Sequence, residues 1–153
     1  MDDGPCAVKF SDLVDQHYAL VFRYSYRLTG SAVDAEDLTQ QVYLTAQAKL
    51  GQLRDAGNAR AWLCTIARNS YLKSLRRRKN GAVVSLESVA EPVEELPAEI
   101  PIDSQELQAA LDDLPEEFRT PLILFYFEEF SYREIAEQMD VPIGTIMSRL
   151  ARA

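Results

Sequence analysis

The feature that most constrains the fold is a set of helix signals at the C-terminal end of the chain. Ser131 is followed three residues later by Glu134, a spacing that predicts a capping box at the start of a helix. Pro142 ends that helix, because a proline disfavours helical backbone at the preceding residue. Gly144 and Thr145 then open a second helix. Two short helices joined by a tight break are typical of a helix-turn-helix, whose second helix can enter the major groove of DNA.

The second helix of this motif has an apolar side and a polar side. Ile146 and Leu150 are predicted to face inward. Hydroxyl and guanidinium groups, which can hydrogen-bond base edges and phosphates, are predicted to face outward. These outward residues are Thr145, Ser148, Arg149 and Arg152. The pattern therefore indicates a DNA-reading helix.

The rest of the chain also has helical periodicity, and no strand pattern is convincing. The predicted helices run from Phe10 to Leu28, from Ser31 to about Leu50, from Ala59 to about Lys79 and from Ser104 through Leu114, and another begins at Pro115. Gly30 is the expected stop of the first helix. In the second, Val33 is expected on the inner stripe with Leu38, Val42 and Ala46. The core side of the last is expected to consist of Phe118, Leu122, Phe125 and Tyr126.

Residues 80–103 lack this periodicity and contain several prolines and glutamates, which predicts a flexible acidic linker. The predicted fold class is therefore all-α. Two small helical domains, residues 1–79 and 104–153, are joined by the linker, and the second contains the helix-turn-helix.

The net charge of −8 hides a strong asymmetry along the chain. Residues 1–79 carry +4 and residues 80–153 carry −12. The basic excess lies at the end of the third predicted helix, where Arg76, Arg77, Arg78 and Lys79 are consecutive. Four consecutive cations exceed what is needed to complement a helix dipole, so nucleic-acid contact is indicated.

Several classes of function lack support in the sequence. His17 is the only histidine, and no partners for a zinc site or a Ser-His-Asp triad are found near it. Cys6 and Cys64 are far apart and are expected to be free thiols. No apolar run is long enough to span a bilayer, and no signal peptide is found. We expect a cytoplasmic, non-enzymatic protein without metal, cofactor or membrane insertion.

Four segments in order resemble bacterial extracytoplasmic-function sigma factors of the sigma-70 family. Residues 35–44 (AEDLTQQVYL) resemble the helix that binds core RNA polymerase, and residues 61–69 (AWLCTIARN) look like the promoter-melting helix. Residues 114–119 (LPEEFR) and 144–153 (GTIMSRLARA) look like the start and end of the C-terminal domain.

The resemblance implies a division of labour between the domains. The first domain would dock on core polymerase through Asp34, Asp37, Gln40, Gln41 and Leu44. It would engage the unpaired minus-10 promoter element, with one base captured outside the stack, through Gln52, Arg54, Asn58, Arg60, Arg68, Asn69, Lys73, Arg76 and Arg77. The second domain would bind the minus-35 element as duplex through Arg133, Thr145, Ser148, Arg149 and Arg152. Core RNA polymerase and promoter DNA are the implied partners, with an anti-sigma factor or another regulator.

Three departures from the family pattern affect these expectations. Met147 stands where a basic residue is frequent, and Gln41 stands where Glu is usual. The sequence ends at Ala153, where the family's recognition helix continues, so either the chain is shortened or its minus-35 contact is weak.

Two other functions remain open at the level of sequence. One is a stand-alone helix-turn-helix regulator, and the other is a helical protein-interaction module. The charge asymmetry also suggests that the acidic linker or the second domain folds over the basic third helix in the free protein, as a mimic of DNA.

Overall fold

The computed structural model describes residues 8–79 and 104–152, and within them it contains α-helices and short 3₁₀ helices but no strand. The elements are α1 (Phe10–Thr29), α2 (Ala32–Ala48), η1 (Leu50–Gln52), η2 (Ala56–Asn58), α3 (Ala59–Lys79), α4 (Ser104–Asp112), α5 (Glu116–Tyr126), α6 (Tyr132–Met139) and α7 (Ile143–Arg152). The predicted all-α class is confirmed. The predicted linker, residues 80–103, lies outside the described residues.

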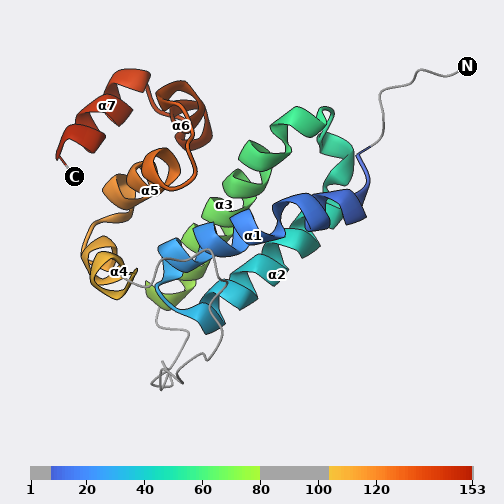
Figure 1. Ribbon diagram of the computed structural model, residues 1–153, viewed down its shortest axis with the longest axis horizontal. Helices are drawn as coiled ribbons and strands as arrows, with labels where there is room; N and C mark the ends of the chain where they lie inside the picture. The colour runs from blue at the N-terminus through green and yellow to red at the C-terminus, as the bar shows by residue number, and fades with distance from the viewer. Residues whose placement is uncertain (1–7, 80–103, 153) are drawn as a thin grey trace, which may run out of the picture.

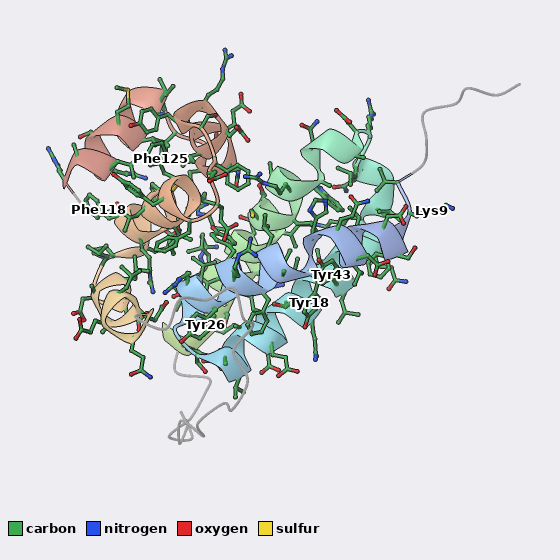
Figure 2. The ribbon with its side chains drawn as sticks, in the orientation of Figure 1. Lys9, Tyr18, Tyr26, Tyr43, Phe118 and Phe125 are labelled. Carbon is green, nitrogen blue, oxygen red and sulfur yellow. The ribbon has the colours of Figure 1, made fainter. Side chains whose placement is uncertain are left out.

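The first three α-helices form one bundle (Figure 1). Its centre consists of fully buried side chains such as Val21, Tyr24, Val42 and Leu63. Tyr18 of α1 stacks beside Tyr43 of α2, with ring centroids 6.2 Å apart (Figure 2). Val33 was wrongly expected in this core and is 53% exposed. It precedes Leu38 by five residues, a spacing that places the two on different sides of a helix.

The boundary between α1 and α2 follows its local sequence. Gly30 ends α1 in the left-handed conformation with a φ of 73°, and its N–H donates to the carbonyl of Tyr26 at 2.8 Å. Ser31 then caps α2, because its hydroxyl accepts a hydrogen bond from the Asp34 N–H at 3.4 Å. The predicted stop and start signals are confirmed.

Replacing Gly30 by alanine should lower the free energy of unfolding by about 1 kcal/mol or more, because a side chain disfavours the left-handed conformation. An added Cβ would also lie 2.7 Å from a carboxylate oxygen of Asp112. Urea denaturation of the full chain measures the loss. Gly51→Ala is the control, since nothing lies within 4 Å of a Cβ built there. Equal stability of the two variants would contradict this account.

Helices α4 and α5 pack against α1, α6 packs against α3, and α7 packs on α5 and α6 (Figure 1). The sequence predicts two domains joined by a tether, and in the structure the two domains also share one apolar core. Tyr24 and Leu28 of α1 and Ile123 and Leu124 of α5 all belong to it, and all four are fully buried.

The predicted core side of α5 is wrong in part. Phe118, Leu122 and Phe125 are only partly buried, and Tyr126 is 65% exposed. The buried side of α5 consists of Arg119, Thr120, Pro121, Ile123 and Leu124. The reason is that α5 lies between α1 and α7 and is covered on two sides. Phe125 faces the helix-turn-helix, where its ring stacks on Tyr132 at 4.8 Å (Figure 2).

The helix-turn-helix is present as predicted. The Ser131 hydroxyl accepts from the Glu134 N–H at 3.1 Å, and the Glu134 carboxylate accepts from the Ser131 N–H at 3.4 Å, which completes the capping box. Asp140 ends α6 with a left-handed φ of 54°, and α7 begins at Ile143. None of the helices in residues 8–79 and 104–152 is long and apolar enough to cross a bilayer.

Candidate protein and nucleic-acid interfaces

One side of α2 carries the residues predicted to bind polymerase. Asp37, Gln40, Gln41 and Leu44 are exposed, and Asp34 is partly exposed beside them. We call these five residues the docking face. Leu44 is 63% exposed, which gives an otherwise polar surface an apolar contact point. Two carboxylates, two amides and a leucine give this face a charge complementary to that of a basic protein surface.

A groove of about 550 Å³ joins the docking face to the basic helix α3. Asp37 and Gln41 of α2 lie on one side, and Asn69, Lys73 and Arg77 of α3 lie on the other. At its end, Arg78 approaches Asp34 at 3.9 Å. The structure therefore brings part of the predicted polymerase-binding set and part of the predicted minus-10 set to one surface.

The segment between α2 and α3 is held by a few contacts. Leu53 is buried in a small cluster with Leu13 and Ala59. The Asp55 carboxylate accepts a hydrogen bond from the Gly57 N–H at 2.9 Å. Predicted minus-10 residues on this segment remain exposed around these anchors; they are Gln52, Arg54 and Asn58.

The predicted minus-10 set on α3 is divided in two. Asn69, Lys73, Arg76 and Arg77 are exposed and form the basic face. Arg60 and Arg68 are partly buried against the second domain, and we describe their contacts separately.

Arg68 and Arg60 each contact the second domain. The Arg68 guanidinium donates to the Glu116 carboxylate at 2.9 Å, and Thr120 donates to the same oxygen. Arg60 donates to the main-chain carbonyl of Glu128, and its guanidinium lies 4.4 Å from the centroid of the Phe130 ring. In this arrangement the guanidinium groups of Arg60 and Arg68 are both bound by residues of the second domain.

Two further polar contacts fix the α1 side of the interface. Arg27 donates to the side-chain oxygen of Gln108 at 3.2 Å, and the Gln108 amide donates back to the Arg27 carbonyl at 3.1 Å. Arg119 donates to the Leu28 carbonyl at 3.0 Å, which satisfies one of the carbonyls left free at the end of α1.

Glu128 is the most enclosed acid of the interface. Its side chain is only 2% exposed, and its carboxylate lies 3.5 Å from the Arg23 guanidinium. Burial raises the pKa of Glu128 above its usual value, while Arg23 opposes this shift. Cations from the first domain therefore favour the charged form of Glu128, which burial disfavours.

The α7 helix presents its side chains differently from the prediction. Thr145 and Arg149 are partly buried, whereas Ser148 and Arg152 are exposed. These four line a hollow of about 410 Å³ with Phe118 and Glu117 of α5. The predicted outer face is therefore rotated toward α5, because Ile146 packs between α5 and α6 and fixes the rotation of the helix. Arg133 is exposed on α6, by the turn that contains Pro142.

Cys64 is a free thiol at the centre of the first bundle and is fully buried. Burial, and after it the nearby Glu128 carboxylate, raise the pKa of this thiol well above its usual range. In a Cys6→Ser variant, Cys64 should react with a disulfide reagent on the order of 100-fold more slowly in buffer than in urea. Absorbance of the released thiolate follows the reaction, and equal rates in buffer and urea would contradict the buried position.

Sequence reasoning missed the residues that join the domains. Glu116, Arg119 and Glu128 were not assigned a role, although the acidic character of their segment was noted. The second domain does cover part of the basic helix, as the charge asymmetry suggested. It reaches Arg60 and Arg68 and leaves the basic end of α3 exposed.

Comparison with known proteins follows the same division of the chain. A family model described as sigma-70 region 2 matches residues 13–81, and one described as sigma-70, region 4 matches residues 104–153. The ECF RNA polymerase sigma factor SigE of Mycolicibacterium smegmatis is 38% identical over 98% of this chain, which spans 60% of that relative. The ECF RNA polymerase sigma factor SigL of Mycobacterium tuberculosis is 34% identical over 90% of this chain and 80% of its own length.

A solved structure has a similar arrangement of helices. It is that of the sigma factor RpoE in complex with the anti-sigma factor NepR from Bartonella quintana. The TM-score is 0.78 and the identity is 30%, with 94% of this chain and 90% of that chain covered.

Proposed function

Since the chain belongs to the extracytoplasmic-function group of sigma-70 family RNA polymerase sigma factors, we propose that it binds core RNA polymerase and directs promoter-specific initiation. Sigma factors are initiation factors, and the polymerase performs the chemistry. We propose that this chain likewise has no catalytic role and acts inside the cell with the polymerase.

The observation that carries this proposal is the groove between α2 and α3. It places Asp37 and Gln41 of the docking face opposite Asn69, Lys73 and Arg77 of the basic face. A polymerase element on α2 and a single DNA strand on α3 would then lie side by side. A stand-alone DNA reader has no need of such a surface in its first domain.

We assign the promoter contacts by domain. Residues 1–79 dock on polymerase and engage the minus-10 element, with Gln52, Arg54 and Asn58 around the captured base and the basic face along the strand. Residues 104–153 bind the minus-35 duplex through α7 and Arg133.

We call the packing of the second domain on the first the closed arrangement. Regulation by an anti-sigma protein follows from it. The relative RpoE adopts a similar arrangement while bound to its anti-sigma factor NepR. In this chain the packed second domain engages Arg60 and Arg68, so minus-10 binding requires the domains to separate. A partner that binds both domains in this arrangement would keep the sigma factor inactive.

Run-off transcription with purified core polymerase and a promoter library tests the proposal. Promoter-specific transcripts that depend on the chain are expected. DNA binding without transcription would favour a stand-alone regulator, and neither activity would favour an interaction module.

A further inference from the structure

One exposed side of α7 is apolar. Ile143 is 49% exposed and Met147 is 52% exposed, and Ala151 is also exposed. They are four residues apart, so they lie on one side of the helix. We call these three residues the α7 stripe.

No packing within the described part of the chain accounts for the stripe. The helix contacts α5 and α6, and its inward side chain Ile146 is fully buried. Isolated exposed apolar residues are ordinary on protein surfaces. Here, however, two large ones are aligned on the second helix of a helix-turn-helix, in its first two turns, where such helices contact bases.

The place of the stripe on the second helix of the helix-turn-helix points to duplex DNA as its occupant. Arg149 and Arg152 lie with Glu117 in the hollow on the α5 side of the helix. Arg133 of α6 lies with Glu137 and Asp140 by the turn before α7. These arginines would contact phosphates, while the stripe would face the floor of the major groove.

We propose that the α7 stripe reads thymine methyl groups in the minus-35 duplex. This rests on the proposed function, in which α7 enters duplex promoter DNA. The C5-methyl of thymine is the apolar group that the major groove displays, and it distinguishes thymine from cytosine by contact with apolar side chains. Met147 therefore selects for thymine, at a position where a basic residue would instead contact a phosphate or a guanine.

The spacing of the stripe sets the spacing of the methyl groups. Four residues of helix rise about 6 Å, and successive bases of a DNA strand are about 3.4 Å apart. Ile143 and Met147 would therefore contact thymines about two base pairs apart. The preferred upstream element should contain thymines with this separation.

The test uses holoenzyme formed from the full chain and core polymerase. A preferred upstream element is first selected from a library randomised in the minus-35 region. Each selected thymine is then replaced by deoxyuridine, which removes only the methyl group. Loss of one contacted methyl should weaken holoenzyme binding about fourfold, as measured by titration of fluorescent promoter DNA.

Two variants of Met147 separate methyl contact from other effects. Met147→Leu keeps an apolar side chain and should keep the difference between thymine and deoxyuridine. Met147→Gln has similar length but is polar, and it should lose most of that difference. Because Met147 is exposed, neither change should prevent folding.

Two results would overturn the inference, and they differ in what they say about the proposed function. If the wild-type holoenzyme binds the selected element and its deoxyuridine version equally well, the sigma function stands and the methyl contact is wrong. If transcription depends on the chain but no upstream sequence is selected, the stripe contacts something other than DNA. Absence of any transcript would refute the proposed function itself.

Discussion

The Asp37→Arg variant should lose promoter-specific transcription almost entirely. Asp37 is exposed at the centre of the docking face and lines the groove that this face shares with the basic helix. Reversing its charge places a cation against a surface expected to be basic, and like charges at an interface cost several kcal/mol. We therefore expect holoenzyme formation to fall on the order of 100-fold, measured by binding to labelled core polymerase and by run-off transcription.

Asp15→Arg provides the matched control for this experiment. Asp15 is exposed on α1, away from the docking face, and the substitution changes net charge by the same amount. It should leave holoenzyme formation close to that of the wild type. If both variants bind core equally well, polymerase docking does not use the Asp37 side of α2.

The Glu116→Arg variant should weaken the contact between the two domains and increase the share of open molecules. Glu116 accepts the 2.9 Å hydrogen bond from Arg68, and the two side chains are 18% and 17% exposed. Breaking a buried pair costs about 3–5 kcal/mol, and we expect about 2 kcal/mol here because of partial exposure. The ratio of closed to open molecules should then fall about 30-fold. Small-angle X-ray scattering should show a larger radius of gyration.

The charge-swapped variant Arg68→Glu/Glu116→Arg tests whether loss of this ion pair causes the shift toward open molecules. It restores an ion pair at the same position and should recover the compact dimensions. Single-stranded minus-10 DNA should bind more tightly to Glu116→Arg than to the wild type, because Arg68 is released. Compact dimensions of Glu116→Arg at low salt would show that the pair does not hold the domains together.

Features set by a few neighbouring residues could be predicted from the sequence. Ser131 and Glu134 form the expected capping box, and Gly30 ends α1, because each depends only on contacts within one turn. The exposure of Asp37 was predicted for a similar reason, since its helix has a single buried side.

Features that depend on packing between distant segments could not be predicted. The buried side of α5 was misplaced because two neighbours cover it, and periodicity cannot show which neighbour is closer to the core. The pairing of Arg68 with Glu116 joins residues 48 positions apart, and nothing local indicates it. From the sequence, Met147 was noted only as a departure from a frequent basic residue. Its orientation depends on how the buried Ile146 fixes the rotation of α7.

Because the two domains share a single core, separating them would require another apolar surface to replace the one that each domain loses. Separating the domains would expose Ile123 and Leu124 on α5 and Leu28 on α1, all fully buried in the closed protein. Exposure of these apolar side chains to water is unfavourable, so an opened molecule would tend to aggregate or to close again. Polymerase would therefore have to cover these apolar side chains as the two domains separate.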